Sequence, residues 1–361
     1  MQNTLTTFFI QVPPPFELLA SEEAELKYKL LFNEKLQTTV VPGGFNIEVE
    51  YYKGVTLNHY LKIPNKILLV LKTFKCRDLP KLFNQISKFK WKHYIGDKTP
   101  KFIINTKQSR LINTSKIEKT LVESFKRSNQ MFLSSKKEKE KTNDYQHFNL
   151  YIQIIDDNCT VSLDTSGERM SLRKERIQVG LAPIRENLAA ALIYQTIKNL
   201  KGHYNFFDPM CGSGVFIIEV NNFFKPTTRD YAYKHFVINI EQPKLTRLKS
   251  NISFNLYGND KSKEQLQICE NNLKNCQIEC LLSNEDILNI EKKDLKDCII
   301  ITNPPYGKRV NIEDSNFENK LVQKIKAVID YKYFGLISLN RNKKNILKFK
   351  NGGIPLFFNY Y

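Results

Sequence analysis

A short apolar run, an acidic residue and two closely spaced glycines follow one another in the middle of the chain and constrain its fold more than any other feature. The run 205–207 leads into Asp208, which is followed by Gly212, Gly214 and the apolar segment 215–220. This order indicates a buried strand that turns sharply into a helix. A Cβ atom would block the tight turn or the close approach of a ligand, and the helix start offers unpaired N–H donors. The pattern therefore predicts an α/β domain with a ligand cradle at a strand tip.

The same loop indicates what kind of ligand would fit. Dinucleotide-binding loops need a third glycine, and Ile217 stands at that position. An acidic residue where a pyrophosphate would otherwise lie suits a ligand that carries a cation, such as the ammonium group of S-adenosylmethionine. Taken alone, the loop is also compatible with an ordinary strand-to-helix turn.

A second motif, Asn303-Pro304-Pro305-Tyr306-Gly307, follows the apolar run 298–302. Two consecutive prolines remove two N–H donors and fix φ twice, so the backbone is rigid and rich in free carbonyl acceptors. The side-chain oxygen of Asn303 and the carbonyl of Pro304 could accept the two hydrogens of a planar amine, with the Tyr306 ring stacked on its base. The simpler alternative is a proline turn that ends a core strand.

With these two motifs the chain resembles class I S-adenosylmethionine-dependent methyltransferases that modify planar amino groups, whose signature is [N/D]-P-P-[Y/F]. The resemblance implies a Rossmann-like, seven-stranded domain over residues 181–361 that ends in a β-hairpin. It implies that Asp260 accepts from a ribose and Asp286 from the adenine amine. Two departures are Ser262, where the family usually has a second acid, and Val215, where threonine is common. The implied catalytic residues are Asn303, Pro304 and Tyr306, and the implied cofactor-binding residues are Pro183, Asn187, Asp208, Met210, Cys211, Gly212, Gly214, Asp260, Asp286 and Asn303.

The N-terminal half shows a different organisation. Residues 1–51 alternate strand-like and helix-like patterns, with a half-buried strand expected at 45–51, and are expected to form a small α+β, ferredoxin-like unit. Residues 52–165 contain a basic amphipathic helix, a charged segment at 134–144 expected to be a solvated loop, and paired strands. This arrangement resembles the THUMP domain, an RNA-binding module, and a linker over 166–180 would join it to the methyltransferase domain. The expected RNA-binding residues are Lys107, Arg110, Lys116, Lys119, Lys126, Arg127, Lys308 and Arg309.

Composition agrees with an intracellular, nucleic-acid-binding protein. The net charge of +18 favours a polyanionic partner. The seven cysteines include no Cys-x-x-Cys pair, so neither a disulfide framework nor a metal site is expected. No apolar stretch approaches ~18 residues, so we expect a soluble, cytoplasmic protein without a membrane partner.

These observations lead to one functional hypothesis with several alternatives. Over nearly its whole length the chain resembles the bacterial group of large-subunit ribosomal RNA guanine-N2 methyltransferases. The implied reaction is methylation of the N2 amine of a guanosine in RNA, with 23S ribosomal RNA as the expected substrate. The same motifs would serve a transfer RNA guanine-N2 enzyme, an RNA adenine-N6 enzyme or a protein-glutamine methyltransferase. A catalytically dead RNA-binding protein is the non-enzymatic alternative, and the sequence leaves the oligomeric state open.

Overall fold

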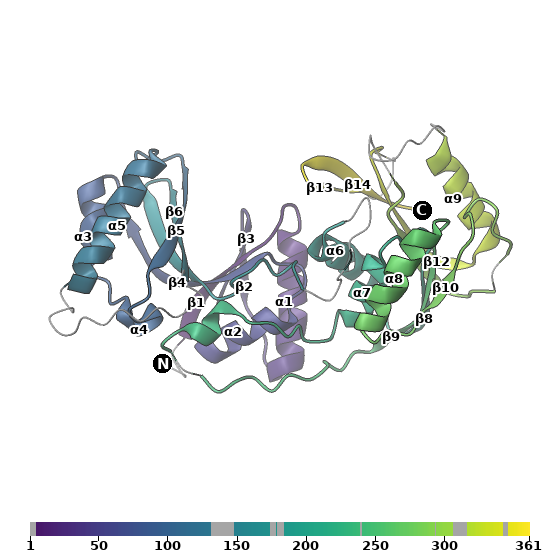
Figure 1. The fold of residues 1–361 in the computed structure, drawn as a ribbon, viewed down its shortest axis with the longest axis horizontal. Coiled ribbons are helices and arrows are strands. Elements are labelled where there is room, and N and C mark those ends of the chain that lie inside the picture. Colours follow the sequence, from purple (N-terminus) through teal and green to yellow (C-terminus); the bar gives the residue numbers. More distant parts are fainter. Residues whose placement is uncertain are drawn as a thin grey trace.

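The computed structural model describes residues 5–130, 148–173, 178, 184–238, 240–292, 294–305, 316–341 and 346–361. The molecule is elongated, with one seven-stranded sheet in its N-terminal half and another in its C-terminal half (Figure 1). Helices cover both sheets. The predicted α/β class, with a Rossmann-like domain behind an α+β region, is confirmed.

The first sheet begins with β1 (Leu5–Gln11), β2 (Thr38–Val41) and β3 (Gly44–Glu50), which surround α1 (Glu17–Phe32) in the sequence. The expected strand at 45–51 ends at Glu50, because Tyr51 already begins α2 (Tyr51–Tyr60), a helix that the sequence pattern did not predict. Helix α2 lies close to β1, since a Cβ atom on Gly54 would come within 2.1 Å of the Phe8 ring. The strand thus ends one residue earlier than expected, at the point where α2 begins to pack on the sheet.

The same sheet continues with β4 (Lys66–Lys75), β5 (Pro100–Lys107), β6 (Phe148–Ile155) and β7 (Asn158–Asp164). Its order is β2-β3-β1-β4-β7-β6-β5. The pairing of β1 with β4 therefore joins the strands before and after the expected boundary at residue 51 into one sheet. Helices α3 (Leu79–Ser87), α4 (Lys92–Ile95) and α5 (Thr114–Gln130) accompany β5 and β6 (Figure 1). The expected charged loop at 134–144 lies outside the described residues.

The second sheet has the order β10-β9-β8-β11-β12-β14-β13. Strands β8 (Gly202–Asp208), β9 (Ile252–Asn259), β10 (Leu281–Ser283), β11 (Cys298–Thr302) and β12 (Tyr331–Ser338) run parallel to one another. Strand β14 (Ile354–Tyr360) runs antiparallel to both β12 and β13 (Ile346–Asn351). Gly352 and Gly353 both have positive φ in the turn between β13 and β14, which confirms the predicted closing hairpin.

Helices bury both faces of this sheet, as parallel strands require. Helices α6 (Glu186–Ile197), α7 (Val215–Asn222) and α8 (Lys263–Asn275) share a core with Phe206, Ile299 and Ile301. Helix α9 (Phe317–Val328) covers the other face, where Phe207 and Ile300 are buried. Because alternate residues of a strand point to opposite faces, Phe206 and Phe207 of β8 and the run 298–301 of β11 are apolar on both sides of the sheet.

Candidate cofactor and amine-binding site

The five parallel strands of the second sheet, β8 to β12, end at one edge, and this edge carries most of the site residues predicted from the sequence. Strand β8 ends at Asp208, β9 ends directly before Asp260, and β11 ends directly before Asn303. Strand β8 pairs with β9 on one side and with β11 on the other. The strand order therefore reverses at β8, and open α/β sheets bind ligands outside the carboxyl ends of their strands at such a point.

The loop after β8 needs glycine at two positions for different reasons. Gly212 and Gly214 have φ of +50° and +82°, a backbone conformation that other residues rarely adopt. A Cβ atom on Gly214 would lie 2.7 Å from the Cys269 sulfur, so the loop packs directly against α8 there. A Cβ atom on Gly212 would meet nothing nearer than Gln265 Oε1 at 4.0 Å. The loop is thus closed against the protein at Gly214 and open to a ligand at Gly212.

Asp208 is a buried carboxyl group at the tip of β8. Its side chain is 1% exposed and accepts a hydrogen bond from the backbone N–H of Met210 at 3.2 Å. Burial raises the pKa of Asp208 to about 7, because the charged form loses water there. Among the described residues no Lys, Arg or His forms an ion pair with Asp208. A ligand-borne cation would therefore stabilise its charged form, and the ammonium group of S-adenosylmethionine fits this requirement.

Asp260 organises the glycine loop. One of its carboxylate oxygens accepts from the Gly212 N–H at 2.9 Å and the other from the Ser262 N–H at 3.0 Å. The Ser262 hydroxyl in turn accepts from the Gln265 N–H and caps the N-terminus of α8. At the position where a second acid was expected, this chain thus has a helix cap, and the half-exposed Asp260 is the carboxylate next to the loop.

Asn259 joins the tips of β8, β9 and β10, and the sequence pattern had suggested no role for it. Its amide nitrogen donates to the carbonyls of Pro209 and Glu285, both at 3.0 Å. Its amide oxygen accepts from the Ser283 hydroxyl at 3.0 Å and from the Glu285 N–H at 3.1 Å. The side chain is 1% exposed. The sequence signal that could have identified Asn259 is its position at a strand end, directly before the acidic residue Asp260.

The remaining predicted residues of this edge flank the loop. Asp286, half-buried after β10, accepts from the Leu288 N–H at 3.0 Å. Asn303 is half-buried and Pro304 is buried, and both follow β11, which pairs with β8 through Ile300 and Phe207. Four of the predicted residues, Pro183, Tyr306, Lys308 and Arg309, lie outside the described residues.

Two predicted cofactor-binding residues have structural contacts of their own. The buried Asn187 donates to Ile63 O at 3.3 Å and to Asn65 Oδ1 at 3.0 Å, so it ties α6 to the N-terminal half. Cys211 donates its N–H to Asn259 O at 2.8 Å. A hydrogen bond with Cys269 and burial hold the pKa of the Cys211 thiol well above its usual range. Cys211 is therefore a neutral thiol in the loop and is unsuited to act as a nucleophile.

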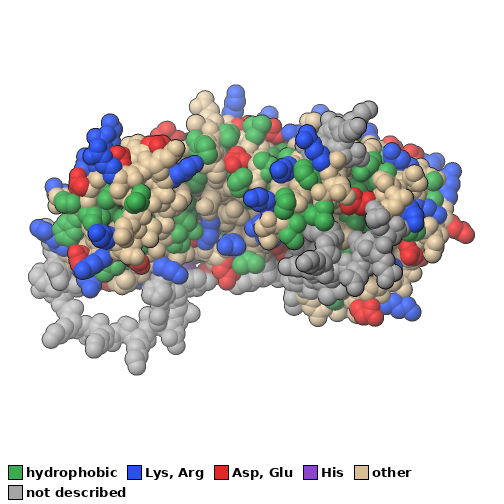
Figure 2. Space-filling model, turned by 90° about the horizontal axis from the view of Figure 1, so that it is seen from above, with side chains coloured by type: hydrophobic (Ala, Val, Ile, Leu, Met, Phe, Trp, Pro, Cys, Tyr) green, Lys and Arg blue, Asp and Glu red, His purple; other side chains and the backbone are tan. Residues whose placement is uncertain are grey.

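The basic residues predicted to contact RNA occupy two ends of one helix. Lys107 is the last residue of β5, Arg110 lies between β5 and α5, and Lys116 and Lys119 lie in the first two turns of α5. Lys126 and Arg127 lie toward the other end of α5, about 16 Å away at 1.5 Å per residue. All six side chains are exposed, although the Arg127 guanidinium also lies 5.6 Å from the Phe83 ring centre. In the face shown in Figure 2, Lys and Arg are spread over both halves of the molecule, so charge alone selects no single RNA path.

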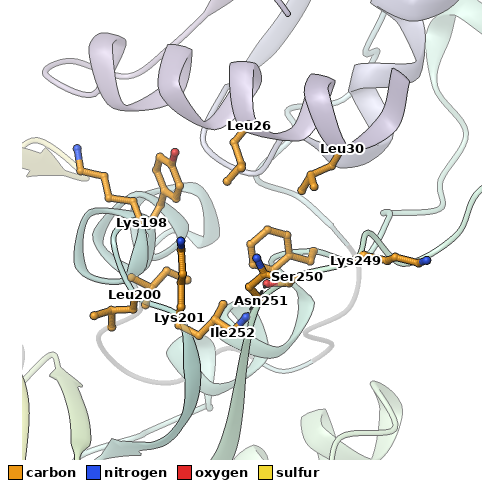
Figure 3. Close-up of a pocket in the computed structure, with 12 residues that line it drawn as sticks. Leu26, Leu30, Lys198, Leu200, Lys201, Lys249, Ser250, Asn251 and Ile252 are labelled. Carbon is orange, nitrogen blue, oxygen red and sulfur yellow. Dashed lines mark hydrogen bonds between the residues drawn. The ribbon is translucent and has the colours of Figure 1, made fainter. Parts of the chain in front are cut away.

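A cavity of about 190 Å³ lies between α1 and the C-terminal domain (Figure 3). Leu26 and Leu30 of α1 form one side. Lys201, before β8, and Ile252, at the start of β9, form another. The amino ends of β8 and β9 are opposite to the edge that carries Asp208, so this cavity is separate from the candidate site.

The described residues contain neither a membrane-spanning helix nor a cluster of metal-ligand side chains. No described helix is long and apolar enough to cross a membrane. Nowhere in the described ranges do three or more His, Cys, Asp or Glu side chains gather in a way that could hold a metal ion.

Comparison with known proteins identifies both halves. A family described as "RMKL-like, methyltransferase domain" matches residues 173–349, and the THUMP domain family matches residues 76–164. The ribosomal RNA large subunit methyltransferase K/L of Psychromonas ingrahamii is 26% identical over 291 residues, covering 74% of this chain and 38% of that protein. The protein of the same name from Colwellia psychrerythraea is 24% identical over 386 residues, covering 98% of this chain and 52% of that protein. This chain thus spans about half or less of the length of these relatives.

A solved structure confirms the fold of the whole chain. The crystal structure of SMU.472 complexed with SAH matches with a TM-score of 0.79 and 19% identity, covering 100% of this chain and 98% of that chain. The fold and the family match over residues 173–349 define a class I methyltransferase domain, the class that uses S-adenosylmethionine. The chain combines this RMKL-like methyltransferase domain with a THUMP domain and is related to the large-subunit ribosomal RNA methyltransferases K/L.

Proposed function

We propose that the protein transfers a methyl group from S-adenosylmethionine to the exocyclic N2 amine of a guanosine in RNA, with 23S ribosomal RNA as the substrate. The observation that carries this proposal is the common edge of β8 and β11. Neighbouring strands there present a cation-accepting loop that begins at Asp208 and an amine-accepting motif that begins at Asn303. A methyl donor and an acceptor amine would therefore meet between two adjacent strand tips.

In this proposal the cofactor side of the site consists of residues from three strand ends. Asp208 pairs with the cofactor's ammonium group, Asp260 accepts from its ribose, and Asp286 accepts from its adenine amine. The open face at Gly212 allows the cofactor to lie against the backbone. Asn259 holds the three tips in register without touching the ligand. The donor supplies an electrophilic methyl group on a sulfonium.

The acceptor side must overcome the weak nucleophilicity of guanine's amine, whose lone pair is delocalised into the ring. Asn303 Oδ1 and the Pro304 carbonyl would accept its two N–H groups, favour a pyramidal nitrogen and align it with the methyl carbon. The nitrogen forms the new N–C bond as the S–C bond breaks, and the extra proton then leaves to water. The site's contribution is therefore positioning and electrostatic stabilisation, and it needs no strong general base.

The N-terminal half would bind the RNA. We assign residues 52–165 to the RNA-binding domain, after an N-terminal unit at 1–51 and before a linker at 166–180 and the catalytic domain at 181–361. The THUMP match over residues 76–164 supports this role. The exposed basic residues at both ends of α5 would contact phosphates and position the RNA without reading its sequence.

Single-turnover transfer of labelled methyl groups tests the proposal. Unmodified 23S ribosomal RNA, unmodified transfer RNA and a duplex DNA are offered separately to the full chain, and labelled nucleosides are identified by mass spectrometry. We expect N2-methylguanosine in the ribosomal RNA. Labelled N6-methyladenosine would show that the methylated atom is N6 of adenine and not N2 of guanine. Label in transfer RNA alone would show that ribosomal RNA is not the substrate. No label in any RNA would refute RNA methylation.

A further inference from the structure

One segment of the methyltransferase domain leaves that domain, reaches the N-terminal half and returns. The chain between α7 and β9 follows this path in Figure 1 and includes the short helix η1 (Ala232–His235) beside the N-terminal half. We call residues 226–238 the strap. Near its far end, Val237 N donates to Tyr94 O at 3.0 Å, and the Phe236 ring lies 5.6 Å from the Phe148 ring of β6. The strap therefore touches the THUMP domain directly.

Closer to the methyltransferase domain, the strap surrounds His59 of α2. Thr227 O accepts from His59 Nδ1 at 2.9 Å, and His59 Nε2 accepts from the Tyr233 hydroxyl at 2.8 Å. Thr227 N donates back to His59 O at 2.7 Å. His59, Thr227 and Tyr233 are all buried. Both ring nitrogens and the backbone carbonyl of His59 are thus hydrogen-bonded to the strap.

Arg229 of the strap binds the segment that follows the last THUMP strand. Its guanidinium donates to Arg169 O at 2.7 Å and Leu172 O at 3.1 Å through one nitrogen. Through the other it donates to Glu168 O at 2.8 Å and Ser166 O at 3.4 Å. The guanidinium also lies 4.7 Å from the Tyr231 ring centre. One side chain therefore holds four carbonyls of residues 166–172.

Residues 166–172 are also anchored at both of their ends, independently of the contact with Arg229. Before them, Asp164 of β7 accepts from Ser166 N at 2.9 Å and from Gly167 N at 3.2 Å and pairs with Lys66 at 2.6 Å. After them, Arg173 forms a buried ion pair with Glu219 of α7 and donates to Lys62 O. Domains joined by a linker move relative to one another unless a large interface holds them. Here the first residues of the linker are held by both halves.

We propose that Arg229 is a positioning residue: it fixes the RNA-binding half relative to the strand edge that carries Asn303, so that bound RNA presents one nucleotide to that edge. This inference rests on the proposed function. Arg229 lies on the strap, away from the residues assigned to the cofactor and the amine. It acts through the carbonyls of 166–172, and its loss should affect where and how fast bound RNA is methylated rather than how tightly either ligand binds.

The test compares Arg229→Ala with Arg247→Ala in the full chain. Arg247 is an exposed arginine in the same crossing between α7 and β9, which makes it a matched control for charge and location. We expect Arg229→Ala to lower kcat on 23S ribosomal RNA at least about tenfold while KM for RNA and the S-adenosylmethionine Kd change less than about twofold. Arg229→Lys, which keeps the charge and can reach only some of the carbonyls, should recover part of kcat. Arg247→Ala should match the wild type.

A second measurement is independent of catalysis. Small-angle X-ray scattering should show a single compact arrangement for the wild type and for Arg247→Ala, and a broader distribution of maximum dimensions for folded Arg229→Ala. Unchanged scattering together with unchanged kcat in Arg229→Ala would overturn the inference, as would an equal loss in both variants. If the wild type fails to methylate any RNA, the proposed function fails, whereas the scattering comparison still decides whether Arg229 holds the two halves together.

Discussion

At the scale of single residues, the candidate site combines one buried acid with one amide at neighbouring strand tips. Asp208 ends β8 and Asn303 follows β11, and these strands are paired. Each residue has a distinct expected effect, because we propose that Asp208 binds the methyl donor and Asn303 the acceptor amine.

Replacing Asn303 tests the acceptor side. Asn303→Ala should leave folding and S-adenosylmethionine binding nearly unchanged and lower single-turnover methyl transfer by about 10²–10³, the range for losing one preorganised polar group. Asn303→Asp keeps an acceptor and should retain part of the activity. Wild-type rates in Asn303→Ala would remove this residue from the catalytic site.

Asp208 should make cofactor binding depend on pH. Its folded pKa of about 7 lies above the ordinary value of 3.8, so ionising it in the free protein costs stability that grows as pH rises from about 4 to about 7. A bound cation offsets this cost, and protons compete with that cation at lower pH. Affinity for S-adenosylmethionine should therefore fall as pH drops from about 7.5 to about 5.5.

Calorimetry on wild type and Asp208→Asn checks this expectation. The variant should bind at least about tenfold more weakly near neutral pH, ~1.4 kcal/mol, and should lose most of the pH dependence. An equally steep pH profile in the variant would show that another group, such as the ligand's own amine, controls the titration.

At the scale of elements, the site depends on strand tips held in register. Three tips are joined by Asn259, which makes four hydrogen bonds to Pro209 after β8, to Ser283 at the end of β10 and to Glu285 after it. The glycine loop adds a second constraint, since Gly214 has no room for a side chain beside Cys269. The cofactor side is therefore preorganised by buried polar contacts, in addition to the helix that follows the loop.

Asn259→Ala should show how much that register matters. Removing the amide leaves the carbonyls of Pro209 and Glu285 without this donor, and a buried group that loses its partner costs about 1–3 kcal/mol. We expect lower thermal stability and weaker S-adenosylmethionine binding by differential scanning calorimetry and titration calorimetry. The matched control is Asn255→Ala on the same strand, where the side chain is exposed and bonds to Asn205. Equal effects of the two substitutions would argue against a special role for Asn259.

At the scale of the whole molecule, the two halves are joined through buried polar groups that depend on protonation state. Burial lowers the pKa of His59 from 6.5 to about 4, so the ring is neutral in the folded protein and charged in the unfolded chain at mildly acid pH. Lys62, Arg229 and Lys234 nearby act in the same direction, while the hydrogen bond to Thr227 opposes it. The stability that neutral His59 contributes is present above about pH 6.5 and is lost as pH falls toward about 4.

Thermal unfolding across this range provides the measurement. The wild type should lose roughly 2–3 kcal/mol of stability through His59 between about pH 6.5 and pH 4, in addition to the background from other groups. His59→Gln should be less stable at neutral pH and should show a shallower loss on acidification. His203→Gln serves as the control, since His203 is exposed and its ring nitrogen Nδ1 forms a hydrogen bond with the Ser253 hydroxyl. Parallel pH profiles for wild type and His59→Gln would assign the acid sensitivity elsewhere.

The sequence by itself determined the class of each half and the strand tips that matter. Hydrophobic runs set β8 and β11, and positions such as Asp208, Gly214 and Asn303 are constrained by chemistry that is local to the turn. The helix cap at Ser262 and the hairpin turn at Gly352 and Gly353 are local in the same sense. Local patterns were therefore enough to predict the strand tips and the ligand cradle, and the family resemblance that the two motifs carry implied the seven-stranded sheet with its closing hairpin.

Only the tertiary structure decided the contacts between segments far apart in the chain. Tyr51 begins a helix rather than ending a strand because Gly54 lets α2 pack on Phe8. Asn259 serves three strand tips, Asn187 bonds to Asn65, and Arg229 binds carbonyls about 60 residues earlier in the chain. None of these partners is fixed by sequence spacing, because each hydrogen bond depends on how two separately formed elements pack together.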